Sequence, residues 1–366
     1  MKRLVLCCDG TWNTADQPAP TNVEKIAKEV TPVGPDGVTQ TVYYHDGVGT
    51  KPRERFWGGV FGVGLSAIVR DTYRAVITNF APGDELFFLG FSRGAYTARS
   101  TVGLIRNCGI LRPEHANKLD DAYTLYRRRD PASTPDAPEA VAFRADYSYE
   151  SQIRFVGVWD TVGALGIPLS GIPLVTLLNR PWQFHDTQLS STVDAACQAL
   201  AIDEHRRPFQ PAVWTPPTDG QVPRHQTWFA GVHSDVGGGY PDHGLSDITL
   251  RWMAAHAHDA GLAFYNDSPL PPAATTTTSP RIGPVTPGAL APAHNTLNLA
   301  YQLLGPITRQ LGQTDPTTEA AATSATGRLA APTAHYQPTN LTTYLQQPNP
   351  HLEPVEFGQG QGAAVE

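Results

Sequence analysis

The chain has 366 residues, of which 40% are hydrophobic and 17% are charged, and its formal net charge at pH 7 is −7. This length and apolar content fit one large α/β domain or two small ones with a substantial core. The negative charge, with no basic cluster along the chain, argues against a nucleic-acid-binding protein.

The first part of the chain alternates apolar strands with helical patterns. A buried strand at 4–8 ends in the turn Asp9-Gly10-Thr11, and an amphipathic helix at 23–30 follows it. The pattern then predicts a strand at 38–44 and a helix at 65–80, which a glycine-rich stretch precedes.

The next segment, from Asp84 to Arg99, contains a G-x-S-x-G pentapeptide centred on Ser92. A doubly buried strand at 86–89 precedes the serine, and residues with helical spacing follow it. Gly90 and Gly94 lack the Cβ atoms that would collide where a strand and a helix cross closely. This order of strand, sharp turn and helix predicts a nucleophile elbow, with a plain strand–turn–helix as the alternative.

The remaining pattern continues the alternation before the composition changes. It predicts, in order, a helix at 113–129, a loop at 131–138, a strand at 153–159, an aliphatic segment at 165–182, a helix at 193–201, a strand at 227–232 followed by a glycine-rich loop, and a helix at 246–260. Alternating strands and helices predict an α/β-hydrolase-like fold, with a mainly parallel central sheet covered by helices on both faces.

Three parts of the chain follow from this pattern. We expect a catalytic domain at 1–265, a linker rich in proline and threonine at 266–293, and a helical and irregular C-terminal extension at 294–366 that packs on the same domain. The extension includes a helix candidate at 295–311. The segment 165–182 is expected to be an insertion, either a lid-like surface for acyl chains or a buried insertion.

The four cysteines, Cys7, Cys8, Cys108 and Cys197, are scattered and show no C-x-x-C spacing. They predict buried thiols in a reducing compartment, with neither a disulfide framework nor a zinc site. No apolar run is long enough to span a bilayer, and the amino terminus does not resemble a signal peptide. We therefore expect a soluble, cytoplasmic protein that, if exported, uses a route without an amino-terminal signal.

Polar residues at three strand ends carry the chemistry. A serine nucleophile needs a base, and the base needs a carboxylate to orient it. Ser92, Asp160 and His233 follow three buried strands in the chain order of an α/β-hydrolase triad. Because the carboxyl ends of parallel strands meet at one edge of a sheet, we predict that Ser92 is the nucleophile, Asp160 the acid and His233 the general base.

Other acids compete with Asp160, which can alternatively be a turn-forming residue at a strand end. Asp235 is the next candidate acid, although its place two residues after His233 also suits a loop-stabilising role. Asp203 and Glu204 are expected to follow a helix and to form surface ion pairs with the arginines beside them.

Other histidines and one polar cluster offer alternatives to His233. His294 is the alternative base, because it lies late in the chain as the histidine of many hydrolases does. Four further histidines are expected at ordinary positions in helices or at strand edges: His205, His225, His256 and His258. A divalent ion at His233, Asp235, Asp242 and His243 lacks a recognisable ligand spacing, so we expect no metal and no cofactor.

The oxyanion hole is predicted from topology. The backbone N–H of Arg93, one residue after the nucleophile, is the first donor, and that of Gly10 or Thr11 is the second. Asp9 precedes these residues and is a secondary candidate for the site. A tight turn is the alternative reading of this stretch.

Several ordered motifs together resemble one known family. They are Leu6-Cys7-Cys8-Asp9-Gly10-Thr11-Trp12-Asn13, Tyr44-His45-Asp46-Gly47-Val48-Gly49-Thr50, Gly90 to Arg99, Val158-Trp159-Asp160-Thr161-Val162-Gly163 and Gly231 to Tyr240. The family is an α/β-hydrolase domain family, long labelled as of unknown function. It includes the catalytic domain of one class of type VI secretion phospholipase effectors. The matches run from about residue 2 to residue 262.

The resemblance implies a triad at Ser92, Asp160 and His233, and esterase, lipase or phospholipase chemistry on carboxylic esters. It also implies an ester or lipid substrate and transient contact with a membrane surface. Effector members of the family tend to carry large membrane-associating regions, and only the linker and extension follow the matched motifs here. A catalytically inactive α/β-hydrolase fold that acts as a binding module is the alternative function.

Overall fold

The structure is a computed structural model. It describes residues 1–10, 19–47, 60–128, 130–163, 189, 191–216, 223–265, 277–279, 283–303 and 305–355. Thr11, the aliphatic segment 165–182 and the end of the chain from residue 356 lie outside the described residues. Parts of the expected linker lie outside them as well.

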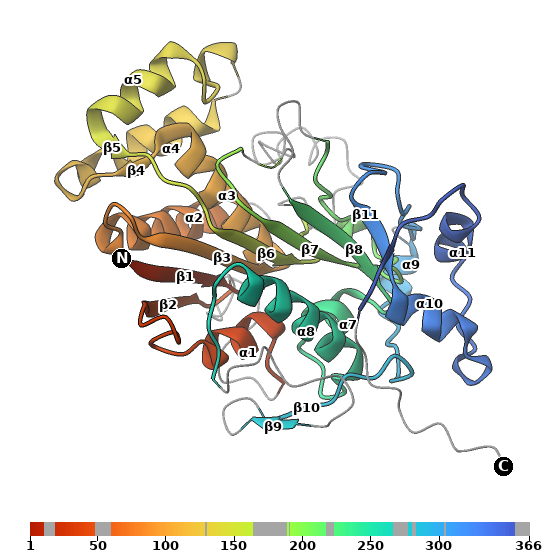
Figure 1. Ribbon diagram of the computed structural model, residues 1–366. Helices are drawn as coiled ribbons and strands as arrows, with labels where there is room; N and C mark the ends of the chain where they lie inside the picture. The colour runs from red at the N-terminus through yellow and green to blue at the C-terminus, as the bar shows by residue number, and fades with distance from the viewer. Residues whose placement is uncertain are drawn as a thin grey trace.

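A sheet of eight strands forms the centre of the molecule, in the order β12-β11-β8-β7-β6-β3-β1-β2 (Figure 1). Every neighbouring pair in it is parallel. The strands are β1 (Lys2–Cys8), β2 (Thr39–His45), β3 (Glu85–Phe91), β6 (Phe155–Trp159), β7 (Ala196–Ala201), β8 (Arg224–Phe229), β11 (Glu319–Ala322) and β12 (Leu352–Glu353). A parallel sheet needs cover on both faces, as the near-continuous apolar runs of its strands predicted.

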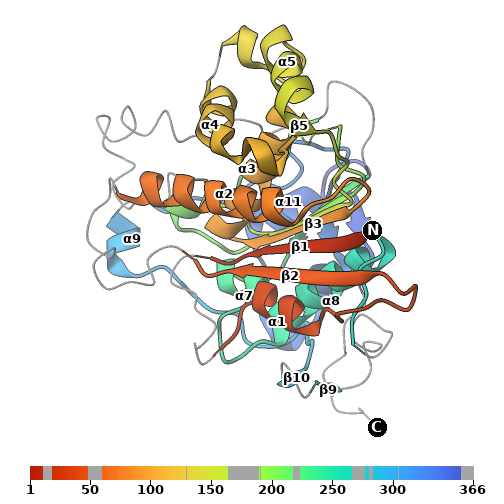
Figure 2. The ribbon, with the colours of Figure 1, turned by 90° about the vertical axis from the view of Figure 1, so that its left-hand side faces the viewer.

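Helices cover both faces of this sheet (Figure 2). On β1, Leu4, Leu6 and Cys8 pack into the core beneath one helical layer, whereas Val5 and Cys7 pack into the core on the other face. The first layer contains α2 (Val60–Asn79), α3 (Arg93–Cys108) and α4 (Leu119–Arg127), with α5 (Pro138–Tyr147) outside it, and the second contains α1 (Asn22–Glu29), α7 (His233–Gly237) and α8 (Gly244–Asp259). The predicted α/β architecture is therefore confirmed.

The strand order changes direction at β1. The chain moves from β1 outward to β2, returns to β3 on the other side of β1, and continues through β6, β7 and β8. Ligands of open parallel sheets bind at the carboxyl ends of the strands where the order reverses. Ser92 follows β3, and Asp9 follows β1, at this position of the sheet.

The C-terminal part of the chain extends the same sheet. β11 pairs with β8, and α10 (Thr323–Ala330) and α11 (Thr339–Leu345) lie beside these strands (Figure 1). Leu341 and Tyr344 of α11 share a buried apolar cluster with Leu200 and Trp228 of the central strands. The last strands of the sheet and its first strands thus belong to one packed structure.

Two predicted helices differ in the structure. The segment 193–201 contains strand β7, wholly buried between β6 and β8, because its central place in the sheet outweighs the helical preference of its alanines. Of the helix expected at 295–311, the described part is helical only as α9 (Leu299–Leu303). Gly305 has a φ of 75°, and Pro306 cannot donate the N–H that a continuing helix needs.

Several smaller elements complete the described fold. Two antiparallel ladders join β4 (Ile110–Leu111) to β5 (Ser148–Tyr149) and β9 (Thr277–Ser279) to β10 (Gly283–Val285). All four cysteines are buried thiols, as predicted. None of the helices in the described ranges combines the length and apolarity needed to cross a bilayer.

Candidate active site

The residues around Ser92 form a tight strand–turn–helix. β3 ends at Phe91, α3 begins at Arg93, and Ser92 between them has a φ of 58°. A positive φ is costly for a residue with a Cβ, and such strain clusters at functional sites. A Cβ on Gly94 would lie 2.0 Å from the carbonyl oxygen of Cys8, so the end of β1 can approach the turn only because this residue is glycine.

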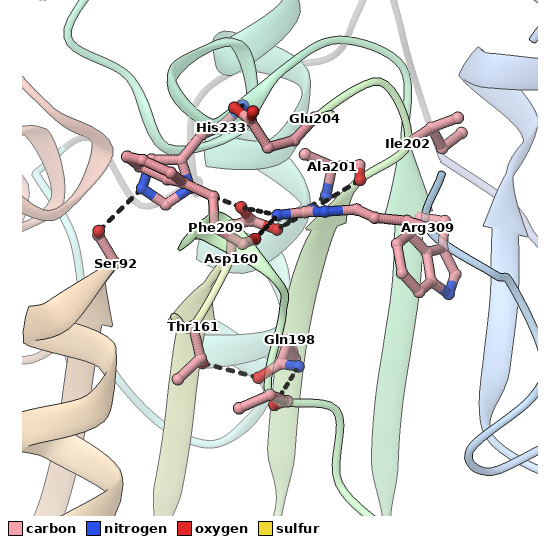
Figure 3. Close-up of polar contacts among 12 residues, drawn as sticks. Ser92, Asp160, Thr161, Gln198, Ala201, Ile202, Glu204, Phe209, His233 and Arg309 are labelled. Atoms are coloured by element: carbon pink, nitrogen blue, oxygen red, sulfur yellow. Dashed lines mark hydrogen bonds and ion pairs between the residues drawn. The ribbon is translucent and has the colours of Figure 1, made fainter. Parts of the chain in front are cut away.

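Ser92, His233 and Asp160 form one chain of hydrogen bonds (Figure 3). The Oγ of Ser92 lies 2.8 Å from Nε2 of His233, and Nδ1 of His233 lies 2.5 Å from Oδ2 of Asp160. All three side chains belong to buried residues. They come from the ends of β3, β8 and β6, so the sheet brings together residues that are far apart in sequence.

The Asp160 carboxylate accepts hydrogen bonds from several buried donors. The backbone N–H of Ala201 donates to Oδ1 at 3.0 Å, and Arg309 donates to both oxygens, at 2.6 and 3.0 Å. Burial alone would raise the pKa of this carboxyl, but the Arg309 guanidinium and the contact with His233 hold it well below its usual range. Asp160 also has a positive φ of 38°. The aspartate is therefore a strained, ionised acceptor for the imidazole.

Aromatic packing fixes the ring of His233. His233 is the first residue of the short helix α7, in place of the expected loop. Its ring contacts those of Phe91 and Phe209, with centroid distances of 4.6 and 4.9 Å. A Cβ on Gly237 would lie 2.0 Å from the Phe91 ring, so the glycine leaves room for this packing. The imidazole is thereby held in line with its two hydrogen-bond partners.

The structure describes two of the three expected oxyanion donors, Arg93 and Gly10. The backbone N–H of Arg93 lies at the amino end of α3, directly after Ser92. The N–H of Gly10 donates to Oδ1 of Asp9 at 2.6 Å, so this bond would have to be released before Gly10 could serve an oxyanion. Thr11 lies outside the described residues.

Asp9 connects three elements next to the site. Its Oδ2 accepts hydrogen bonds from the hydroxyl groups of Tyr44, at 2.5 Å, and Thr21, at 2.6 Å. Burial and the neighbouring Asp9 carboxylate raise the pKa of Tyr44, which therefore remains a donor. Asp9 thus ties the end of β1 to β2 and to the start of α1.

The alternative acid and the alternative base pair with each other. Nδ1 of His294 lies 2.6 Å from Oδ1 of Asp235, and the backbone N–H of His294 donates to Oδ2 at 3.0 Å. The backbone N–H of Val232 also donates to this carboxylate, and the ring of Tyr240 stacks on His294 at 3.9 Å. Asp235 therefore holds the loop around His233 to the C-terminal part of the chain.

The prediction that Glu204 follows a helix and lies at the surface was wrong. Asp203 and Glu204 follow strand β7, and Glu204 is completely buried. Its ion pair with Arg206 does form, with a separation of 2.7 Å between Nη2 and Oε2. Glu204 also lies 3.4 Å from the backbone N–H of His233, because the ends of β7 and β8 are adjacent. Burial raises the pKa of Glu204, but Arg206 more than offsets it and lowers the pKa.

Side chains that could hold a metal ion lie together at a place away from Ser92, His233 and Asp160. His233, Asp235 and His243 do not share a site, because each pairs with a different residue: His233 with Asp160, Asp235 with His294, and His243 with Asp247. Within the described ranges, one group of three residues has ligand atoms close enough to hold an ion: His225, His256 and Glu353. His225 lies near the start of β8, whereas His233 follows its end, so this group is at the opposite end of the strand from the triad.

Arg309 is the residue of the site that the sequence did not reveal. It lies in an irregular stretch far from the other motifs, and no local pattern marks it. Its side chain is completely buried and reaches Asp160 between Ala201 and Phe209 (Figure 3). A lone arginine of this kind can be recognised only once the fold has placed the acid next to it.

Known proteins resemble this chain in sequence. Residues 2–256 match the family model described as the catalytic domain of Tle1-like phospholipase effectors of the type VI secretion system. The uncharacterized protein YEL023C of Saccharomyces cerevisiae is 27% identical over 238 residues, which cover 59% of this chain and 33% of that protein. The chain therefore spans about a third of the length of this curated relative.

Solved structures are similar at lower identity. A crystal structure of an uncharacterized protein from Pseudomonas aeruginosa is 18% identical with a TM-score of 0.43, over 72% of this chain and 46% of that one. The structure of the Tle1 effector bound to the VgrG spike of the type VI secretion system is 19% identical with a TM-score of 0.38, over 66% of this chain and 52% of that one.

Proposed function

Because the chain belongs to the family of Tle1-like phospholipase effector catalytic domains, we propose that it is a serine hydrolase that cleaves carboxylic esters of lipids or phospholipids. The observation that carries this proposal is the hydrogen-bonded chain from Ser92 Oγ through His233 to Asp160, with separations of 2.8 and 2.5 Å. A serine is a poor nucleophile at neutral pH unless a base accepts its proton.

The proposed reaction proceeds through an acyl-enzyme. Ser92 Oγ forms a bond to the ester carbonyl carbon while Nε2 of His233 takes the hydroxyl proton. The carbonyl oxygen becomes an oxyanion, and the backbone N–H of Arg93 is the donor proposed to stabilise it. When the intermediate collapses, the C–O bond to the alcohol breaks and His233 gives the departing alcohol its proton.

Hydrolysis of the acyl-enzyme repeats these steps with water. His233 removes a proton from the water molecule, whose oxygen attacks the acyl carbon, and the bond to Ser92 breaks as the serine regains a proton. Asp160 keeps Nδ1 of His233 protonated and stabilises the imidazolium that forms in each half-reaction.

The family supports a lipid substrate and, with it, transient contact with a membrane surface. We propose no nucleic-acid partner, in keeping with the net charge of −7. Family membership also supports delivery through a type VI secretion system from a cytoplasmic, soluble state. Purified protein offered a panel of phospholipids, neutral lipids and short esters identifies the head group and the bond that it cleaves.

A fluorophosphonate probe tests the proposed chemistry directly. It reacts covalently with an activated serine, so we expect labelling of the wild-type chain and none of Ser92→Ala. Wild-type protein that is folded but unlabelled would instead favour a catalytically inactive hydrolase fold that binds a partner. Labelling retained in Ser92→Ala would place the nucleophile elsewhere.

A further inference from the structure

Arg309 forms a two-point ion pair with Asp160 in which both side chains are completely buried. Nη1 donates to Oδ1 of Asp160 at 2.6 Å, and Nη2 donates to Oδ2 at 3.0 Å. The same two nitrogens donate to the carbonyl oxygens of Ala201, at 2.7 Å, and Phe209, at 2.5 Å. The terminal nitrogens of a guanidinium carry four N–H groups, and each has an acceptor here.

We propose that Arg309 is a positioning residue of the reaction, which fixes the Asp160 carboxylate so that Oδ2 faces Nδ1 of His233. This inference rests on the proposed serine hydrolase function. The residue touches no reacting atom and acts through the aspartate. Since the family match ends at residue 256, Arg309 also makes the later part of the chain a component of the catalytic site.

The contacts of Arg309 explain how it would set the geometry. Ala201 ends β7, and Phe209 packs against the ring of His233 at 4.9 Å. One guanidinium therefore joins the acid, the neighbouring strand end and the turn that supports the base. Its planar fork matches a carboxylate at two points, whereas the ammonium of lysine is a single point charge.

The main chain of Arg309 is held as firmly as its side chain. The side-chain amide of Asn340 donates to the carbonyl oxygens of Arg309, at 3.1 Å, and Ile202, at 2.9 Å. Asn340 belongs to α11 and is itself buried. The C-terminal helix thus fixes the backbone from which the guanidinium extends.

The positive charge of Arg309 also affects the ionisation of Asp160. Asp160 is buried, and burial opposes its ionisation, whereas the guanidinium favours it. Protonation of the His233–Asp160 pair would inactivate the enzyme. Removing the buried positive charge of Arg309 would make protonation of the Asp160 carboxylate easier.

Kinetics of Arg309→Met and Arg309→Lys on a short soluble ester test the inference. In Arg309→Met we expect kcat to fall on the order of 10²-fold, because the Asp160 carboxylate would be misplaced. KM should stay unchanged, because Asp160 does not contact the substrate. The acid limb of the kcat/KM profile should move up by about 1–3 pH units. Arg309→Lys keeps the charge but loses the fork, so it should lower kcat and leave the acid limb in place.

Arg328→Met is the matched control. Arg328 is another buried arginine of the C-terminal part, and its Nη1 donates to the carbonyl oxygens of Ala289 and Ala291, both at 2.7 Å. We expect this variant to lose thermal stability but to keep the wild-type acid limb. An acid limb that moves equally in Arg328→Met and Arg309→Met would reduce Arg309 to a structural residue and overturn the inference.

The remaining outcomes separate the inference from the proposed function. A wild-type chain that neither hydrolyses esters nor reacts with fluorophosphonate overturns both. An active wild type with an unchanged acid limb in Arg309→Met overturns the positioning role alone. Should Arg309→Met fail to fold, Arg309→Lys decides: a wild-type kcat in that variant contradicts the need for the fork.

Discussion

His294 binds Asp235 as closely as His233 binds Asp160: Nδ1 to carboxylate oxygen separations are 2.6 and 2.5 Å. Only the second pair continues to a serine, through the 2.8 Å contact between His233 and Ser92. Two imidazole–carboxylate pairs thus lie in one region of the sheet edge, and the hydroxyl group distinguishes the proposed catalytic pair from the structural one.

The first prediction compares the two aspartates. Asp160→Asn should lower kcat/KM on the order of 10⁴-fold, because an amide cannot hold the imidazole in the required tautomer. Asp235→Asn should lower it less than tenfold and act mainly on thermal stability, since Asp235 supports a loop. Steady-state hydrolysis of a chromogenic short ester measures both. Comparable losses in the two variants would contradict the assignment of Asp160.

A second prediction concerns Ser92 and His233 as one unit. Ser92→Ala and His233→Ala should each lower kcat on the order of 10⁶-fold, and the double variant should lose no more than either single variant. The reason is that a base without a nucleophile, or a nucleophile without its base, does no more than the remaining oxyanion contacts. Additive losses on the same ester would mean that the two residues act in separate steps.

A third prediction follows from the close approach of β1 to the turn after Ser92. Gly94→Ala places a Cβ 2.0 Å from the carbonyl oxygen of Cys8, where backbone rather than a flexible side chain must move. The free energy of unfolding should fall by about 1–3 kcal/mol or more, and activity should fall with it. Gly288→Ala is the control, because its nearest neighbours would lie 3.8 Å away. Chemical denaturation of both variants checks the difference.

The adjacency of Ser92, Asp160 and His233 could be predicted because each follows a strand buried on both faces. A polar residue after such a strand is conspicuous, and parallel strands bring their ends together, so Ser92, Asp160 and His233 could be placed without coordinates. Arg309, the partner of Asp160, could not be predicted, because it reaches the site through long-range packing that leaves no pattern near it in the sequence. The sequence offers His294 as an alternative base, but its pairing with Asp235 becomes visible only in the folded chain.

Two strands escaped prediction for a shared reason. β7 (Ala196–Ala201) and β11 (Glu319–Ala322) are rich in alanine, which favours helices when judged locally. Both are fully buried, β7 between β6 and β8 and β11 against β8. Small side chains suit strands that helices cover closely on both faces, and this context becomes visible only in the assembled sheet.

A fourth prediction concerns the buried ion pair between Lys25 and Asp247, whose separation is 2.7 Å. Burial raises the pKa of Asp247, but contacts with His243 and Lys25 outweigh it and leave the pKa below its usual value. A carboxyl group whose pKa is lowered by folding binds fewer protons in the folded protein than in the unfolded chain. Its contribution is therefore present above the unfolded pKa of about 3.9 and is lost as the pH falls through the folded pKa.

Asp247→Asn should consequently cost about 3–5 kcal/mol at pH 7, because it leaves Lys25 buried without its counter-charge. The variant should also lose stability less steeply than wild type as the pH is lowered below 4. Urea unfolding at several pH values measures both effects. A variant that keeps the acid dependence of the wild type would show that other carboxyl groups govern it.

The last prediction is that divalent cations are not needed for hydrolysis. The proposed nucleophile, base and acid all come from the chain, and Asp160 is already neutralised by Arg309 at 2.6 Å. Removal of metal ions with EDTA should leave kcat/KM on a short ester unchanged within twofold.

The group of His225, His256 and Glu353 supplies the internal control, since Oε1 of Glu353 lies 3.4 Å from Nδ1 of His225 and 3.6 Å from Nε2 of His256. A metal bound there would change thermal stability, not the rate, because the group lies near the start of β8 while His233 follows its end. Loss of activity with EDTA that Glu353→Gln does not reproduce would show that an essential ion binds outside this group and would contradict the prediction.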